Sequence, residues 1–428
     1  MAVIVPPVNA PTPPAAATIT APAVQVVFTD GALTVTVGGL QSFTTGIGRS
    51  SPRTDAAGAG EASLLIRDTS RVLDPDNSSS SLYGHLTPGG TTTVQLQVWN
   101  GTIWVPLYTG MIDSLTTSYP GAGINDVALH LVDAARDLNL HIPASGTIYP
   151  QQQSGARISQ MVGAQSRSAW GWINRAPSGS FNIDAGQKVL TPLTTDGQTS
   201  TWQCITNAAL AEKGVVFFDQ GGVLTYQDQI HRFRSSTPRF TFGDDHTSEV
   251  WVEQSLTYSF SNDRMLADVA YNSGDGFTSG YGRGGSFQWL TATTTQNTSQ
   301  VTGTDTGLAD RYQAAARSRW EFEHYSVNRR DAPTVDINAF GEWPTITGNA
   351  RFGVAIRANL GDYVQLNRRP TVGSTITKFY WIDQIQHNFT GGQNPTWMTT
   401  FTLAAADQIF TFQQLGTTTI GSVTALPW

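Results

Sequence analysis

The sequence predicts a β-rich α+β fold in which two similar antiparallel β-barrels flank a smaller α+β domain. Three observations support this fold class. The 428-residue chain is too long for one ordinary domain. Gly and Pro are plentiful, at 42 and 21 residues, which is typical of strands joined by many turns. Finally, the segments around residues 94 and 364 resemble each other.

Composition argues against several classes of function. Only 13% of the residues are charged, three Lys accompany 22 Arg, and the formal net charge is −7, so a protein that reads DNA through clustered basic residues is disfavoured. The single cysteine, Cys204, excludes an internal disulfide framework and a cysteine-rich zinc site. No stretch of 18 apolar residues predicts a membrane span, and no signal peptide is expected, because the first basic residue, Arg49, follows a proline-rich start.

Residues 1–24, rich in Pro, Ala and Thr, are expected to form an N-terminal arm. The arm is either disordered and polyproline-like or an extended strap that orders against a neighbouring subunit. Residues 25–140 are expected to form the first barrel. Outside its clearest hairpin, its strands are predicted at Val24–Phe28, Leu33–Val37, Glu61–Arg67, Tyr108–Ser118 and Asp126–Val132.

The clearest local signal is a β-hairpin from Val94 to Val105. Alternating residues flank Asn100-Gly101, a dipeptide that tolerates the positive φ angles of a type I′ turn. At the end of the first barrel, Asp133 is expected to cap a short helix over Ala134–Leu140.

Residues 141–240 are expected to form an α+β domain, because helical patterns appear here beside the strand patterns. Ser154 precedes a helix over Gly155–Gln165, and Ser200 or Thr201 is expected to cap a helix over Trp202–Lys213 that Gly214 ends. A second hairpin is predicted from Val215–Asp219 and Val223–Asp228 around a glycine-rich turn.

The second barrel is expected from residues 241–275 and 334–406. Its strands are predicted at Val250–Phe260, Met265–Tyr271, Thr334–Phe340, Asp362–Asn367, Phe379–Phe389 and Trp397–Leu403. Residues 276–333 are expected to be a helix-containing insertion, with a helix over Thr306–Trp320. The residues expected on one side of that helix are Leu308, Tyr312, Ala315, Ala316 and Arg319. Residues 407–428 are expected to be a C-terminal tail.

An internal repeat connects the two expected barrels. At an offset of 270, residues 88–135 and 358–405 share eight identities in 48 positions, against about three by chance. The matches are Val94-Gln95-Leu96 with Val364-Gln365-Leu366, Ile112-Asp113 with Ile382-Asp383, Gly121 with Gly391, and Ala134-Ala135 with Ala404-Ala405. Three chains with two equivalent units each would build a ring of six, so a trimer could sit on a sixfold tube.

No catalytic, cofactor-binding or metal-binding residue is assigned. The seven histidines lack metal-site spacing, and Asp244-Asp245-His246 fits a solvated turn better than a ligand cluster. Asp74-Pro75-Asp76-Asn77 fits a turn whose side chains bond their own backbone, and Cys204 fits a buried structural thiol.

Ile112-Asp113 and Ile382-Asp383 have two interpretations. The favoured one is a strand-edge carboxylate that accepts backbone hydrogen bonds within its own barrel. The other places the pair at contacts of a ring. The acidic chain would also suit a conduit for DNA, since like charge on the wall keeps DNA from adhering.

Several stretches resemble the minor tail proteins of long-tailed phages that infect actinobacteria, which belong to the baseplate-hub (tail-tip hub) or tail-associated-lysin superfamily. In order along residues 25–405, the similar stretches are Glu61–Asp68, Leu73–Gly84, Leu107–Asp113, Gly214–Leu224, Leu360–Val364 and Trp397–Leu403. The Pro-rich residues 1–24 and the absence of a long C-terminal lysin or receptor-binding extension depart from the pattern.

The resemblance implies a structural, non-enzymatic tail-tip hub without cofactors. Its homotrimer would form a pseudo-sixfold ring of tube-like barrels in the virion, assembled in the host cytoplasm. The distal tail protein and tail tube would lie above it, and spike or receptor-binding proteins for host attachment below it. Tape-measure protein, and then DNA during genome ejection, would pass through the ring, with no stable membrane insertion.

Two alternatives remain open at the level of sequence. A carbohydrate-binding adhesin is suggested by the 12 Trp residues, although Trp202 and Trp397 fall on core-like faces. A cell-wall hydrolase is the other, although no nucleophile motif supports it and nothing in the sequence pairs its acidic residues.

Overall fold

The computed structural model describes residues 22–49, 58–121, 124–166, 181–235, 237–245, 248–252, 268–272, 278–282, 288–290, 300–303, 308–325, 334–340, 342, 345–369, 373–392 and 395–406. The N-terminal arm up to residue 21, the predicted strand positions 253–267 and the tail from residue 407 lie outside these ranges.

Thirteen strands form one continuous sheet. Its N-terminal strands are β1 (Val24–Asp30), β2 (Leu33–Val37), β3 (Leu40–Gly48), β4 (Glu61–Arg67), β5 (Thr93–Trp99), β6 (Trp104–Gly121) and β7 (Ile124–Val132). Its C-terminal strands are β15 (Phe240–Gly243), β16 (Val250–Trp251), β21 (Thr334–Asn338), β22 (Tyr363–Arg368), β23 (Ile376–Thr390) and β24 (Thr396–Ala405).

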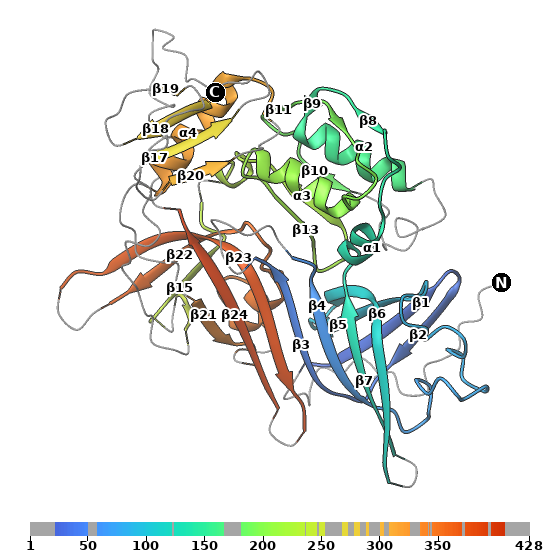
Figure 1. The fold of residues 1–428 in the computed structure, drawn as a ribbon. Coiled ribbons are helices and arrows are strands. Elements are labelled where there is room, and N and C mark those ends of the chain that lie inside the picture. Colours follow the sequence, from blue (N-terminus) through green and yellow to red (C-terminus); the bar gives the residue numbers. More distant parts are fainter. Residues whose placement is uncertain are drawn as a thin grey trace.

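The order of strands places the N-terminal and C-terminal halves edge to edge. It runs β2-β1-β5-β6-β7-β4-β3-β23-β22-β15-β16, and β24 and then β21 adjoin the other edge of β23. The long strands β24, β23, β3, β4, β7 and β6 lie side by side, and β1 and β2 run across them (Figure 1). The sheet is therefore curled (Figure 1), and its main hydrophobic core lies on one face.

Alternation in the sequence explains which face is buried. In β4, Ala62, Leu64 and Ile66 are buried, whereas Ser63 and Leu65 face outward. The same core continues under the second half of the sheet, where Trp397 is fully buried and Phe43 stacks on Phe389 at 5.0 Å between ring centroids. One hydrophobic core thus supports both halves.

The internal repeat is present in the strand pairing. Thr93 lies opposite Met111 in the first half, and Tyr363 lies opposite Trp381 in the second, so both partners are displaced by the same 270 residues. In both long strands, β6 and β23, one extra residue forms a β-bulge directly after the Ile, and that residue is Asp113 or Asp383. The strands β5, β6, β7 and β4 are therefore arranged like β22, β23, β24 and β21. The flanking strands differ, because β1 joins β5 antiparallel whereas β15 joins β22 in parallel.

The constant offset of 270 residues holds up to the turn of the long hairpin and changes after it. Ile112 lies opposite Leu131, whereas Ile382 lies opposite Leu403, so β7 corresponds to β24 at an offset of 272. The second copy has two more residues around its hairpin turn. The expected match of Ala134-Ala135 with Ala404-Ala405 is therefore wrong, because it pairs the start of a helix with the end of a strand.

Two separate closed barrels are not found among the described strands. Instead, β3 of the first copy pairs with β23 of the second over seven residue pairs, from Gln384 opposite Gly48 to Thr390 opposite Ser42. The β-rich α+β class is confirmed, but its strands form one open, curled sheet. The sequence could not show this seam, since its strands are more than 300 residues apart.

A second core lies in an α+β unit between the two copies. Its elements are α1 (Ala135–Leu140), β8 (Ile148–Tyr149), β9 (Gln152–Gln153), α2 (Ser154–Ser166), β10 (Asn182–Ile183), β11 (Val189–Leu190), β12 (Leu193–Thr194), α3 (Thr201–Ala211), β13 (Val215–Phe218), β14 (Leu224–Gln227) and η2 (His231–Phe233). As predicted, Ser200 caps α3 by accepting the Gln203 N–H at 3.1 Å, and β13 and β14 form a hairpin.

A four-stranded sheet with one helix follows in the chain. Its elements are β17 (Asp268–Asn272), β18 (Thr278–Gly282), β19 (Gln288–Leu290), β20 (Gln300–Gly303) and α4 (Arg311–Tyr325). The helix begins later than predicted, because Asp310 accepts the N–H groups of Tyr312 and Gln313. Tyr312 is exposed rather than buried, and Ala314, Ala315 and Ser318 form the buried side.

Some elements differ from the expectation or were not predicted. The hairpin loop between Trp99 and Trp104 has four residues rather than a two-residue turn, because Asn100 Oδ1 accepts two N–H groups inside the loop. β3 was missed because Gly46 and Gly48 dilute its alternation. Helix α5 (Arg351–Arg357) was also missed.

Candidate assembly interface

The bulge carboxylate of the second copy fastens the seam between the copies. Asp383 is fully buried and forms ion pairs with Arg49 at 3.1 Å, just after β3, and with Arg232 at 2.5 Å, from η2. The Arg49 N–H also donates to the Asp383 carbonyl oxygen at 2.9 Å. Burial acts to raise the pKa of Asp383, but the two guanidinium groups outweigh it and hold the pKa below its usual value.

The equivalent carboxylate of the first copy has weaker surroundings. The Asp113 side chain is 32% exposed and lies 3.1 Å from His130 on β7 and 2.5 Å from Arg136 on α1. The sequence-based expectation gave these two aspartates backbone N–H groups as partners; the structure shows cationic or imidazole side chains beside both of them. Only Asp383 connects two copies.

The side chains on the inner face of β23 are buried where β3 pairs with this strand. Ile385, His387 and Phe389 are buried there. Burial lowers the pKa of His387 to about 3, so its imidazole is neutral, and its Nδ1 lies 2.9 Å from the Thr399 hydroxyl. The seam is therefore a packed interior rather than a surface contact.

The corresponding edge of β6 carries no strand in the described part of the chain. β5 pairs with β6 only as far as Met111, and beyond the bulge β6 pairs only with β7. Leu115 and Thr117, the counterparts of Ile385 and His387, are partly exposed, and Tyr119, the counterpart of Phe389, is 57% exposed. The Tyr119 hydroxyl donates to Asp74 at 3.1 Å. This open edge, Ser114–Tyr119, is the feature that sets the two copies apart.

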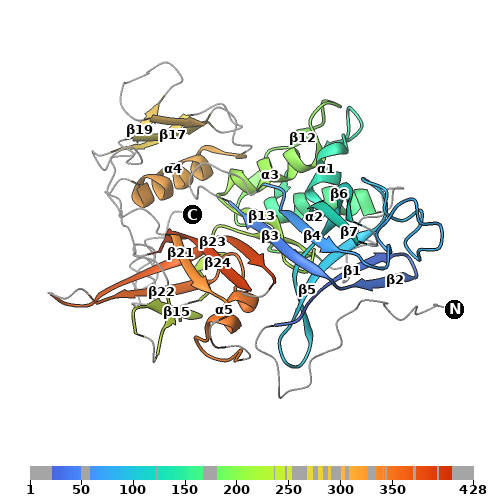
Figure 2. The same cartoon turned by 90° about the horizontal axis from the view of Figure 1, so that it is seen from below.

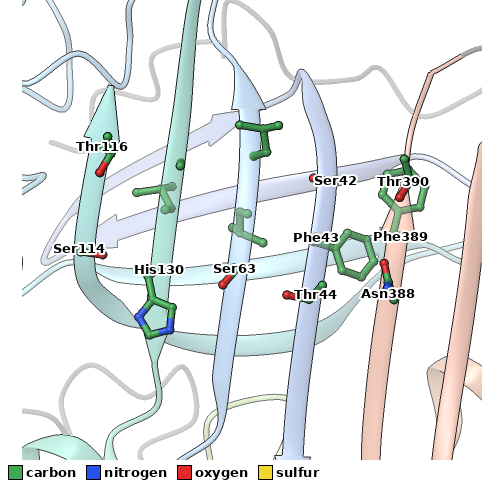
Figure 3. A pocket seen from close by; sticks show the side chains of 14 residues that line it. Ser42, Phe43, Thr44, Ser63, Ser114, Thr116, His130, Asn388, Phe389 and Thr390 are labelled. Carbon is green, nitrogen blue, oxygen red and sulfur yellow. The ribbon is translucent and has the colours of Figure 1, made fainter. Parts of the chain in front are cut away.

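The outward face of the sheet is hollowed. A cavity of about 400 Å³ crosses five neighbouring strands, from Ser114 and Thr116 on β6 to Asn388 and Thr390 on β23 (Figure 3). The outward side chains that line it are hydroxyls, an amide, Ala128, Leu65 and the imidazole of His130. No Asp, Glu, Lys or Arg is among these lining residues, so the side chains of the hollow itself carry no fixed charge.

A buried carboxyl marks the junction between the sheet and α1. Asp133 accepts the Gly60 N–H at 2.6 Å and the Ala135 N–H at 2.9 Å, the latter at the start of α1, close to the predicted capping role. Burial raises the pKa of Asp133 to about 7, although both N–H groups oppose the shift. The Tyr108 hydroxyl donates to the Gly60 carbonyl at 2.8 Å and closes this junction.

The other residues singled out in the sequence have structural partners. Cys204 is a buried free thiol whose pKa burial raises. Asp74 accepts the Asp76 N–H at 3.0 Å, which confirms the expected turn. Asp244 pairs with Arg368 and Arg369, and His246 lies outside the described residues. Within the described ranges no group of three or more His, Cys, Asp or Glu side chains could hold a metal ion.

The tryptophans do not gather into a sugar-binding platform in the described part of the chain. Trp202, Trp381 and Trp397 are buried, and Trp99 and Trp104 pack against each other at 5.5 Å. No described helix is long and apolar enough to cross a membrane.

Sequence reasoning found the two bulge aspartates but not the seam or the open edge. The repeat identified Asp113 and Asp383 as equivalent positions, and the structure places both at the same bulge. What makes the positions different is the neighbouring strand, which comes from a distant part of the chain.

The sequence matches no protein-family model and no curated protein. Two solved structures are similar over nearly the whole chain. A tail protein from Neisseria meningitidis MC58 is 12% identical, with 89% of this chain and 96% of that chain covered and a TM-score of 0.56. The 43 kDa tail protein of prophage MuSo2 from Shewanella oneidensis is 12% identical, with 90% and 98% covered and a TM-score of 0.53. The chain therefore has the fold of these tail proteins.

Proposed function

We propose that this chain is a structural, non-enzymatic hub of a phage tail tip, which assembles as a homotrimer around a channel. The observation that carries the proposal is the duplicated strand pairing, with its bulge aspartate at the same place in both copies. The fold shared with two tail proteins supports a role in a tail.

The duplication supplies the symmetry that such a hub needs. One chain presents two equivalent strand arrangements joined at the β3–β23 seam. Three chains around an axis present six, so a threefold assembly can match a sixfold tail tube. The tube-like wall then arises in the trimer rather than in two closed barrels of one chain.

The concave outward face is proposed to line the channel. Its hydroxyl and amide side chains offer hydrogen bonds but no fixed charges around the hollow (Figure 3). Lining residues without Lys or Arg offer no cation within the hollow that would bind DNA phosphates, so DNA could pass this part of the wall without adhering. The sequence-based idea of an acidic wall is thereby replaced by an uncharged one at this position.

The partners proposed from the sequence resemblance fit this arrangement. The hub would lie at the distal tip of the virion, with the distal tail protein and tail tube above and spike or receptor-binding proteins below. Tape-measure protein would occupy the channel until DNA leaves. Particular partners and the type of host, including the actinobacterial hosts, belong to this proposal.

The test is the molar mass of the purified protein by light scattering over a range of concentrations. The proposal predicts a species of three times the chain mass of 46.0 kDa, at least at high concentration. A protein that stays monomeric or dimeric at every concentration contradicts the proposal.

A further inference from the structure

We propose that Asn100 is a site of intramolecular deamidation, at which the loop between β5 and β6 converts its own asparagine to aspartate and isoaspartate. The reacting side chain, the main-chain nitrogen that attacks it and the two N–H groups that promote the attack all belong to the exposed loop Asn100–Ile103 (β5 and β6 are labelled in Figures 1 and 2). This chemistry belongs to the loop alone and does not depend on whether the chain assembles.

Gly101 supplies the attacking nitrogen. Among the asparagines of the sequence, Asn100 alone is followed by glycine. Gly101 is exposed and has a φ of 96°, and a Cβ atom at this position would meet no described atom within 4 Å. Water can therefore reach the Gly101 nitrogen and take up its proton, and no side chain on Gly101 obstructs the approach of this nitrogen to Asn100 Cγ.

Two main-chain N–H groups polarise the Asn100 amide. Its Oδ1 accepts the Thr102 N–H at 2.9 Å and the Ile103 N–H at 2.8 Å. Because only the oxygen of an amide accepts hydrogen bonds, the two donors determine which end of the side chain faces the loop. Donors at this oxygen stabilise the negative charge that forms on it when a nucleophile adds to Cγ, as in an oxyanion hole.

The same hydrogen bonds hold the reacting groups together. Thr102 and Ile103 follow Gly101 in the chain, so hydrogen bonds to them turn the Asn100 side chain toward the peptide that joins it to Gly101. The Asn100 N–H also donates to the Ile103 carbonyl at 3.1 Å and closes the loop. Attack within such a fixed loop avoids much of the entropy cost that the same reaction has in a flexible chain.

The reaction needs no partner other than water. The Gly101 nitrogen loses its proton and forms a bond to Asn100 Cγ, the Cγ–Nδ2 bond breaks, and ammonia leaves, which yields a succinimide ring. Water then opens this ring. Opening at the side-chain carbonyl gives aspartate, whereas opening at the main-chain carbonyl gives isoaspartate.

A second loop of this chain shows that a carboxylate fits the same arrangement. Asp196 precedes Gly197, and its Oδ1 accepts the Gln198 N–H and the Thr199 N–H, each at 2.8 Å. The Thr199 and Gln198 N–H groups, together with the Thr199 hydroxyl, lower the pKa of Asp196 to about 2. An aspartate formed at position 100 is therefore expected to keep the loop.

Isoaspartate is expected to disturb the hairpin instead. It routes the main chain through Cγ, which inserts one additional carbon between the Cα atom of residue 100 and the nitrogen of Gly101. The lengthened loop changes how Trp99 and Trp104 meet at the ends of the two strands, where their ring centroids are 5.5 Å apart. Once the two products are separated by chromatography, the isoaspartate form is expected to melt at a lower temperature than the aspartate form.

Peptide mapping by mass spectrometry tests the proposal on the folded, full-length protein. After incubation at mildly alkaline pH, where the Gly101 nitrogen loses its proton more readily, Asn100 is expected to yield two products of equal mass, aspartate and isoaspartate. Asn77 is the internal reference, because its Oδ1 accepts the Ser79 N–H at 3.2 Å, its Nδ2 donates to the Arg71 carbonyl at 2.7 Å, and serine follows it. Asn77 is expected to remain an amide while Asn100 converts.

The same chain in guanidinium chloride separates the effect of the loop from that of the dipeptide, since denaturation removes the hydrogen bonds but keeps the sequence. We expect Asn100 to convert faster in the folded protein than in the denatured chain, by about tenfold or more, because donors at a developing oxyanion have effects at least this large in enzymes. Equal or slower conversion in the folded protein overturns the proposal, because the loop would then not promote the reaction.

The variant Thr102→Pro tests one donor directly. It keeps Asn100 and Gly101 but removes the Thr102 N–H that Asn100 Oδ1 accepts. Its folded form is expected to convert more slowly than the folded wild type and to approach the rate of the denatured chain. A variant that converts as fast as the folded wild type would contradict the role of this N–H group.

Discussion

Asp113 and Asp383 show how one residue acquires different roles in two copies of the same strand arrangement. Both occupy a bulge after Ile, but Asp383 is closed in by Arg49 and Arg232, whereas Asp113 is one-third exposed. The repeat explains why both positions are Asp. How much each Asp contributes to the free energy of unfolding depends on whether a neighbouring strand buries it.

The first prediction concerns this pair. Asp383→Ala leaves two buried or half-buried guanidinium groups without their carboxylate and is expected to lower the free energy of unfolding by about 3 kcal/mol or more. The matched change Asp113→Ala is expected to cost about 1 kcal/mol or less, because its pair is partly exposed. Urea denaturation measures both, and equal losses would contradict a seam fastened by Asp383.

Asp133 and His387 are expected to give opposite dependences of stability on pH. Burial raises the pKa of Asp133 to about 7, so its protonated form favours folding and stability falls as the pH rises from about 4 to about 7. Burial lowers the pKa of His387 to about 3, so its neutral form favours folding and stability falls as the pH drops below about 6.5. Each slope is about 1.4 kcal/mol per pH unit.

The two slopes largely cancel between about pH 4.5 and about pH 6.5. Asp383, whose pKa is lowered, adds no slope there, because its stabilisation is lost only below about pH 4. Removing one group should expose the other: Asp133→Asn is expected to lose stability as the pH falls, and His387→Gln to gain it. Denaturant unfolding across this range measures the slopes, and two variants that follow the wild-type curve would refute the assignment.

At the scale of elements, the open edge of β6 is expected to control association. Leu115→Lys places a charge on the unpaired edge of β6, where an edge-to-edge contact in the proposed trimer would bury it, while in the free chain the partly exposed side chain can reach water. The trimer is therefore expected to dissociate with little change in melting temperature. Leu65→Lys is the control, because Leu65 faces outward on β4, away from any sheet edge, and its trimer should persist. If both variants remain trimeric, this edge is not an interface.

Local elements were predictable where the sequence itself specifies them. Alternation with Asn100-Gly101 predicted the β5–β6 hairpin, and Ser200 predicted the start of α3. β3 could not be predicted, because Gly46 and Gly48 interrupt its alternation of apolar and polar residues and its partner β23 is remote in sequence. Because β3 was not predicted, neither the seam between β3 and β23 nor the unpaired edge of β6 could be predicted from the sequence.

At the scale of the whole molecule, the repeat predicted two copies, but only the structure shows how they are joined. The copies are fused through β3 and β23 into one sheet with a continuous core, so that their relative position is fixed before any assembly. A pre-set angle between the copies is what a threefold ring with six matching units requires.

Electron cryomicroscopy of the assembled protein tests this arrangement most directly. The predicted particle is a closed threefold ring with six similar lobes, with the hollowed face of Ser63, Thr116 and Asn388 turned toward a central channel. A ring with this face on its outer surface, or a particle in which the two copies of each chain do not alternate around one axis, would contradict it.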